Sequence, residues 1–232
     1  MVSALRVAVI VPAFNEERLI LRTLSNMPAS VDAIYVVDDA SSDDTWRVLG
    51  TATDARLHRI RHSKNRGVGA AIVTGYYHAL CDGADVLTVM AADAQMDASD
   101  LPALLAPAIT GQASYVKGNR FAHPRYRDMP ALRRWAGRAL AMLTRWCSGL
   151  NVHDTQCGYT ALLASCAESL PLDRIWPRYG YPNDLLLLLA QRGYSVAEVP
   201  VRPVYRDEKS GVRPWHAALI LGLILQRWAR PL

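Results

Sequence analysis

An apolar run at residues 86–90, VLTVM, ends abruptly in the polar stretch AADAQMD. Strands covered on both faces of a parallel sheet read as continuous apolar runs, so this segment predicts a buried strand. In open α/β sheets the ligand crevice lies just past the carboxyl ends of the strands. Asp93 and Gln95 fall at that point, and their oxygens suit a hard divalent cation that also holds a diphosphate. A polar strand exit that only caps the next helix is the alternative.

Strand-like and helix-like segments alternate through the N-terminal half of the chain. Residues 6–11, 34–37 and 57–60 are short apolar runs, and a polar turn and a helix-like segment follow each of them. This alternation is typical of a doubly wound α/β domain with a mainly parallel sheet and helices on both faces.

Polar residues follow three of the predicted strands. Asn15 and Glu16 come after the first, Asp39 after the second, and Asp93 with Gln95 after the fourth. Because the carboxyl ends of parallel strands meet at one edge of a sheet, we expect these side chains to share one crevice. Each cluster alone is typical of a solvated turn, whereas three together favour a site.

Composition limits the class of partner. The 232 residues are 51% hydrophobic and 20% charged, which indicates a globular chain. A net charge of +5 favours anionic partners such as phosphates or an acidic membrane surface, while dispersed Lys and Arg and only two Phe argue against nucleic acid. The four cysteines lack CxxC spacing, which predicts buried free thiols in a reducing compartment.

The motifs VPAFNEE, VVDDASSDDT, KNRGVGAA and DAQMD occur in this order, and GNRF, DTQCGY and YPND follow them. Together they resemble family 2 glycosyltransferases of the GT-A fold, in particular the branch with dolichol-phosphate mannose synthase and bacterial polyprenyl-phosphate glycosyltransferases. The resemblance covers residues 5–212. It implies a catalytic domain at residues 1–212, which an apolar and basic helix at residues 213–232 follows.

The resemblance assigns the donor, a GDP- or UDP-sugar, to the first strand exits. The residues expected to contact its nucleotide or diphosphate are Pro12, Ala13, Asn15, Glu16, Asp39, Asn65, Gly67, Gly69, Arg206 and Lys209. Glycines at a helix start let backbone approach a ligand, and the helix start favours an anion. Arg206 and Lys209 lie in a loop that resembles the family's lid over the diphosphate, where they could neutralise charge on the leaving group.

The metal motif departs from the family. Relatives usually carry Asp-x-Asp-x-Gln, and this chain has Ala91 in place of the first acid. We therefore expect Asp93 to be the main ligand of Mg²⁺ or Mn²⁺ and Gln95 to support it, since such ions also take waters and phosphate oxygens. By family register, Asp97 is expected to cap the next helix. A non-catalytic nucleotide-sugar binding protein is the alternative that Ala91 suggests.

A basic, amphipathic helix is predicted around residues 132–146. In the resembled branch, arginines that match Arg120 and Arg138 hold the phosphate of the lipid acceptor. Asp154 matches an acidic loop that orients the acceptor or the donor. Asp184 occupies the place of an acid near the acceptor, where it would act as a general base for a sugar hydroxyl, position a phosphate acceptor, or cap the following helix.

The resemblance thus implies an inverting, metal-dependent transfer of a sugar to a polyprenyl phosphate, with a glycan hydroxyl as the alternative acceptor. Such an enzyme would act in cell-envelope glycan biosynthesis. The apolar run at residues 217–225 is shorter than the roughly 20 residues that span a bilayer, so an interfacial helix or a homodimer contact is expected. The expected location is the cytoplasmic face of a membrane.

Overall fold

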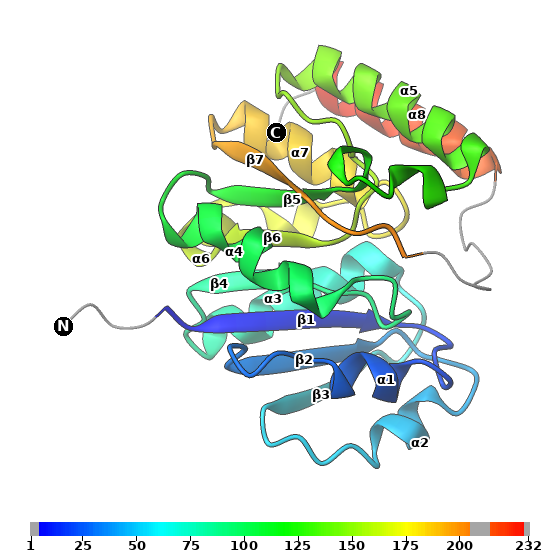
Figure 1. The fold of residues 1–232 in the computed structure, drawn as a ribbon, viewed down its shortest axis with the longest axis vertical. Helices are drawn as coiled ribbons and strands as arrows, with labels where there is room; N and C mark the ends of the chain where they lie inside the picture. Colours follow the sequence, from blue (N-terminus) through cyan, green and yellow to red (C-terminus); the bar gives the residue numbers. More distant parts are fainter. Residues whose placement is uncertain (1–4, 205–213, 230–232) are drawn as a thin grey trace.

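The computed structural model describes residues 5–204 and 214–229, which form a seven-stranded sheet between two layers of helices (Figure 1). The strands are β1 (Val7–Ala13), β2 (Ala33–Asp38), β3 (Leu57–Arg61), β4 (Val86–Val89), β5 (Tyr115–Asn119), β6 (Thr160–Leu163) and β7 (Val196–Pro200). The helices are α1 (Ile20–Ser25), α2 (Thr45–Leu49), α3 (Val68–Cys81), α4 (Leu101–Ile109), α5 (Ala131–Ser148), α6 (Ala164–Ser169), α7 (Tyr181–Gln191) and α8 (Pro214–Ala229). Four single 3₁₀ turns are η1 (Ala98–Asp100), η2 (Arg120–Ala122), η3 (Tyr126–Asp128) and η4 (Leu172–Arg174).

The strand order is β3-β2-β1-β4-β6-β5-β7, and β6 alone of these runs antiparallel to its neighbours. β1 pairs in parallel with β2 and β4, so that Ala13 lies opposite Asp38 and Ile10 opposite Val89. The predicted doubly wound, mainly parallel sheet is confirmed. The exits of β1, β2 and β4 consequently share one edge, as their polar residues had indicated.

Both faces of the sheet are buried, which explains the uninterrupted apolar runs. In β1, Val7, Val9 and Val11 pack towards α1 and α4, whereas Ala8 and Ile10 pack towards α3 and α7. Every residue of β1 is buried.

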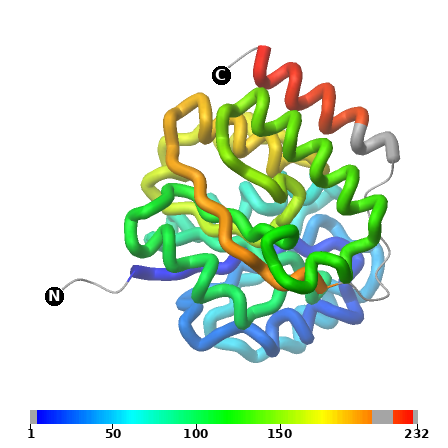
Figure 2. Tube along the Cα trace, turned by 45° about the horizontal axis from the view of Figure 1, so that its top comes forward, coloured from blue at the N-terminus to red at the C-terminus, as the bar shows by residue number. Residues whose placement is uncertain are grey.

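A further layer lies outside α7. Leu187 of α7 packs with Ile220 and Ile224 of α8, and partly buried residues of α5 complete this cluster. α5 and α8 therefore run side by side on the outer surface of the molecule (Figures 1 and 2). Within the described residues, no helix combines the length and the apolar character that a membrane crossing requires.

The four cysteines are free, and Cys157 and Cys166 are buried as expected. Cys147 is partly exposed and Cys81 is exposed, so the prediction of a buried thiol is wrong for Cys81. Cys81 is the last residue of α3, where the helix leaves the core for the turn at residues 82–83.

Candidate active site

The exits of β1 and β2 are joined by hydrogen bonds. The Asn15 N–H donates to Ser41 Oγ (3.0 Å), the Glu16 N–H donates to Thr45 Oγ1 (2.7 Å), and Asn15 Oδ1 accepts from the Ser42 N–H (2.9 Å). Asn15 adopts a left-handed backbone with φ 59°, which Asn tolerates better than most residues. Asn15 and Glu16, both predicted to follow the first strand, are therefore linked directly to the loop that follows β2.

Asp39 is buried and holds the start of α3. Its Oδ1 accepts from the Arg66 N–H (2.8 Å), its Oδ2 accepts from the Gly67 N–H (2.7 Å), and His62 Nδ1 lies 2.7 Å from Oδ1. A carboxylate at a helix N-terminus is stabilised by the helix dipole. Each carboxylate oxygen can accept two hydrogen bonds. A contact from Asp39 to a base or ribose stays a prediction, and the ligand would bind the same carboxylate as the N–H groups at the start of α3.

Gly67 and Gly69 allow a close approach to the start of α3, and the group that approaches is another part of the protein's own backbone. A Cβ at Gly69 would lie 2.4 Å from the Trp176 carbonyl oxygen, and one at Gly67 would lie 2.4 Å from the Pro177 carbonyl oxygen. The Ala70 N–H donates to the same Pro177 oxygen (3.0 Å). The sequence had suggested that a ligand makes this close approach, whereas residues 176–178 occupy the side of α3 that these glycines leave open.

Gly69→Ala is therefore expected to lower the free energy of unfolding by about 1–3 kcal/mol, because the new methyl group overpacks against the Trp176 carbonyl. Gly222→Ala is the matched control, since a Cβ there meets nothing within 4 Å and alanine favours the α8 helix. Chemical denaturation measures both variants. Equal effects of the two substitutions would contradict the packing seen around Gly69.

The loop after β4 places Asp93 and Gln95 together. Asp93 Oδ1 accepts from the Gln95 N–H (3.0 Å), and Ala94 between them has a left-handed φ of 54°. Both side chains are half-buried. No group of three His, Cys, Asp or Glu side chains that could enclose a metal exists within the described residues. One carboxylate and one amide oxygen suit an ion that takes its remaining ligands from water and a diphosphate.

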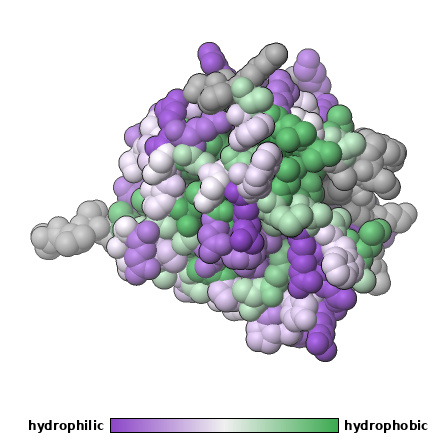
Figure 3. All heavy atoms as spheres, turned by 90° about the horizontal axis from the view of Figure 1, so that it is seen from above, coloured by the Kyte–Doolittle hydropathy of each residue, from purple (hydrophilic) through white to green (hydrophobic). Residues whose placement is uncertain are grey.

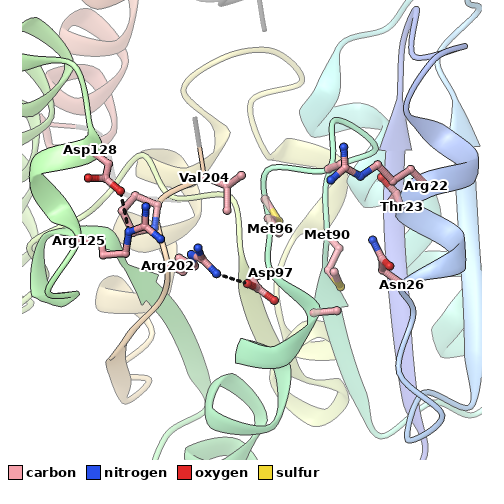
Figure 4. Close-up of a pocket in the computed structure, with 13 residues that line it drawn as sticks. Arg22, Thr23, Asn26, Met90, Met96, Asp97, Arg125, Asp128, Arg202 and Val204 are labelled. Carbon is pink, nitrogen blue, oxygen red and sulfur yellow. Dashed lines mark hydrogen bonds and ion pairs between the residues drawn. The ribbon is translucent and has the colours of Figure 1, made fainter. Parts of the chain in front are cut away.

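Asp97 lies in the same loop but is engaged elsewhere. Its Oδ1 accepts from the Ser99 N–H (3.0 Å), and its Oδ2 lies 3.5 Å from Arg202 Nη1. Asp97 and Arg202 both line a cavity of about 560 Å³ (Figure 4). The Ser99 hydrogen bonds and then Arg202 lower the pKa of Asp97 despite its partial burial. The Asp97 side chain caps the 3₁₀ turn η1, whereas Asp100 is the N-cap residue of α4, so Asp97 caps only the turn that leads into the helix it was predicted to cap.

Arg120 and Asp154 form a buried ion pair beside the exit of β5. Arg120 Nε donates to Asp154 Oδ2 (2.7 Å), Arg120 Nη2 donates to Oδ1 (2.9 Å), and the Arg120 N–H also donates to Oδ2 (3.0 Å). Asp154 is fully buried, which by itself raises its pKa, but the charge and hydrogen bonds of Arg120 outweigh burial and leave that pKa below its usual value. Glu198 Oε1 accepts a hydrogen bond from the Asp154 N–H (2.9 Å).

Asp184 is also fully buried and paired. Its Oδ2 accepts from the Trp176 N–H (2.7 Å) and from Arg227 Nη2 (2.9 Å). α7 begins at Tyr181, directly after Gly180 with φ 109°, so the prediction that Asp184 is the N-cap is wrong. The glycine allows the left-handed turn that starts the helix four residues earlier than expected.

A basic pocket of about 370 Å³ lies between η3 and α5, and its lining residues are Tyr126, Arg127, Arg134, Trp135 and Arg138. No Asp or Glu is among the described residues that line it. Arg134 Nη1 donates to the Arg127 carbonyl (3.0 Å), and the Arg138 guanidinium lies 5.5 Å from the centre of the Phe121 ring. Of these arginines, only Arg138 was predicted to belong to a site. The adjacent arginines at residues 133–134 indicate a basic helix face. Helical spacing does not predict that Arg127, which lies in η3 outside this helix, lines the same pocket.

Large apolar side chains remain exposed along α5 and α8. Trp135 is 70% exposed and Trp146 is 68% exposed on α5, and Leu219 and Trp228 are exposed on α8. The Trp146 and Trp228 rings lie 5.2 Å apart, so the two helices present one continuous apolar face. Seen from above, an apolar patch lies beside hydrophilic residues (Figure 3).

The structure thus gathers Pro12, Ala13, Asn15, Glu16, Asp39 and Asp93 at one edge of the sheet. Arg138 lines the basic pocket, whereas Arg120 is paired with Asp154 and is not among the described residues that line this pocket. Arg206 and Lys209 lie outside the described residues.

The family model for glycosyl transferase family 2 matches residues 8–164. The UDP-N-acetylglucosamine–dolichyl-phosphate N-acetylglucosaminyltransferase of Methanococcus voltae is 28% identical over 214 residues, which cover 85% of each protein. The undecaprenyl-phosphate mannosyltransferase of Micrococcus luteus is 32% identical over 213 residues, covering 88% of this chain and 85% of that protein.

Among solved structures, glucosyl-3-phosphoglycerate synthase from Mycobacterium tuberculosis with Mn²⁺, UDP-glucose and phosphoglyceric acid matches with a TM-score of 0.73 and 21% identity. The match covers 99% of this chain and 82% of that chain. This likeness concerns the fold, and together with the family match it confirms the expected GT-A fold.

Proposed function

The chain belongs to glycosyl transferase family 2 and is a sugar-transferring enzyme, and we propose that it moves a sugar from a nucleoside diphosphate to a polyprenyl phosphate. The observation that carries the proposal is the basic pocket at η3 and α5, which adjoins the exposed apolar face of α5 and α8. Arginine guanidinium groups bind phosphate oxygens in a fixed, forked geometry. Trp135 lines the pocket and is itself exposed, so it joins the phosphate-binding part of the surface to the lipid-binding part.

The reaction suits an acceptor that needs no deprotonation. An ionised phosphate oxygen attacks the anomeric carbon, the bond from that carbon to the nucleoside diphosphate breaks, and the leaving diphosphate keeps the electron pair. Attack opposite the leaving group inverts the anomeric configuration. A glycan hydroxyl would instead need a general base, and Asp154 and Asp184, the two acids considered for acceptor chemistry, are buried against Arg120 and Arg227.

We assign the donor to the exits of β1, β2 and β4. Pro12, Ala13, Asn15 and Glu16 would line the nucleotide, with Asn65 and the start of α3 beside it. Asp93 and Gln95 would hold Mg²⁺ or Mn²⁺, which neutralises charge on the diphosphate. In support, the fold is similar to that of a glucosyl-3-phosphoglycerate synthase solved in complex with Mn²⁺ and UDP-glucose. Arg206 and Lys209 are proposed to act on the same diphosphate.

Residues 1–212 are proposed as the catalytic domain and residues 213–232 as the segment that carries an interfacial helix. Exposed tryptophans and leucines on α5 and α8, together with arginines beside them, fit the interface of a membrane with anionic lipids. We infer that the enzyme contacts the cytoplasmic face of a membrane at this surface. A homodimer through the same apolar face is the alternative occupant.

Arg138→Ala is expected to raise the KM for polyprenyl phosphate about 10- to 100-fold, because it removes a charged hydrogen-bond donor from the basic pocket. The KM for the nucleotide sugar should stay unchanged. Arg145→Ala is the matched control, since Arg145 is exposed on the same helix and does not line the pocket. Steady-state kinetics with each substrate varied measures both. Equal KM values for Arg138→Ala and Arg145→Ala would place the acceptor phosphate elsewhere.

A further inference from the structure

A short segment, residues 174–180, connects the outer helices to the proposed donor pocket. On its outer side, Arg227 of α8 donates through Nη2 to both the Arg174 carbonyl (3.0 Å) and Asp184 Oδ2 (2.9 Å). Asp184 accepts the Trp176 N–H with the same oxygen (2.7 Å). The Arg227 side chain is only 11% exposed and Asp184 is fully buried, so this pair is shielded from solvent.

The inner side of the segment packs against the start of α3. The carbonyls of Trp176 and Pro177 leave room for no side chain at Gly69 and Gly67, and Pro177 accepts the Ala70 N–H. Further along the segment, burial and then the charge of Glu16 raise the pKa of Tyr179. The contacts of Trp176 and Pro177 place the segment directly against the start of α3, which lines the proposed donor pocket.

α7 and α8 pack against the end of the segment. Asn183, next to Asp184, accepts from Gln156 Nε2 (2.6 Å) and donates to Thr144 Oγ1 of α5 (2.8 Å). A Cβ at Gly180 would lie 3.1 Å from Leu223 of α8, so α8 packs directly against the end of the segment. Close-packed contacts of this kind transmit small displacements.

We propose that Asp184 and Arg227 are positioning residues that hold residues 174–180 against the start of α3, and that they thereby couple the position of α8 to the donor pocket. Asp184 then acts on the reaction through the Trp176 backbone. Removing either Asp184 or Arg227 would leave the other charge buried without its partner, so this ion pair is costly to break. The effect on donor binding rests on the function proposed above, whereas the effect on α3 does not.

Hydrogen exchange on the full chain tests the coupling. In Arg227→Met, the Ala70 amide should exchange about tenfold faster than in the wild type, the factor that corresponds to roughly 1.4 kcal/mol of local opening. Amides of β1 and β2 should keep their protection. Arg227→Lys retains the charge and should restore part of the protection, which also covers the case that Arg227→Met folds poorly. Gln226→Met, at an exposed neighbouring position of α8, is the matched control and should have no effect.

Binding of UDP and of GDP, each with Mn²⁺, gives the second readout. The nucleotide that the wild type binds should bind about tenfold more weakly to Arg227→Met and to Asp184→Asn, with a smaller change in kcat at saturating donor. Unchanged Ala70 exchange in Arg227→Met, or an equal rise at every amide, would overturn the coupling. So would an Asp184→Asn variant that loses turnover a hundredfold or more with intact nucleotide binding, because that is the pattern of a general base. A wild type that binds neither nucleotide would contradict the proposed donor, and the exchange data would still decide the coupling.

Discussion

Asp93→Ala is expected to lower kcat/KM for sugar transfer about 10²- to 10³-fold, because it removes the carboxylate proposed to hold the metal against the donor diphosphate. The Ala91 side chain has no oxygen, and the Asp97 carboxylate binds Ser99 and Arg202, so we expect neither to replace Asp93. Transfer rates measured over a Mn²⁺ titration check this expectation.

Two variants make the metal test specific. Asp97→Ala should cost about 1 kcal/mol of stability through loss of a helix cap, and its transfer rate at saturating Mn²⁺ should stay within a few-fold of the wild type. Ala91→Asp restores the acid that relatives carry and should lower the Mn²⁺ concentration needed for half-maximal rate. An Asp93→Ala variant with wild-type metal dependence would refute the role given to the β4 exit.

The second large effect is on stability. Arg120→Met is expected to lower the free energy of unfolding by about 3–5 kcal/mol, because it leaves the fully buried Asp154 carboxylate without its ion-pair partner. Arg125→Met is the control: Arg125 pairs with Asp128 at the surface, and such exposed pairs contribute at most about 1 kcal/mol. Urea denaturation at neutral pH measures both.

The same pair predicts a pH dependence. Since Arg120 holds the folded-state pKa of Asp154 below its usual value, the stability from the pair is complete above the unfolded-state pKa of about 3.9 and is lost as pH falls through the lower folded-state value. The difference between wild type and Arg120→Met should therefore be largest near neutral pH and shrink in acid. A stable Arg120→Met variant with weakened acceptor binding would instead indicate that Arg120 faces the phosphate.

Local patterns predicted the fold well. The alternation of apolar runs and helical segments depends on residues close together in the chain, and it correctly predicted β1, β2 and β4 with their polar exits at one edge of the sheet. The helical cap at Asp97 was predictable for the same reason, since its partner is Ser99.

Long-range partners were not predictable in this way. Arg120 and Asp154 were each assigned to substrates, yet they bind each other across 34 residues of sequence. Asp184 and Arg227 are 43 residues apart, and only the packing of α8 on α7 brings them together. The motif around Gly67 correctly indicated a close backbone approach, but no pattern in it could identify residues 176–178 as the approaching segment.

The most direct test is the product itself. The enzyme is incubated with Mn²⁺, radiolabelled UDP- and GDP-sugars, and undecaprenyl phosphate in anionic vesicles, and the organic phase is counted and analysed by mass spectrometry. We predict a glycosyl phosphate lipid with inverted anomeric configuration, formed with the wild type and strongly reduced with Asp93→Ala. No labelled lipid with any common donor, or transfer only to glycan hydroxyls, would contradict the proposed function.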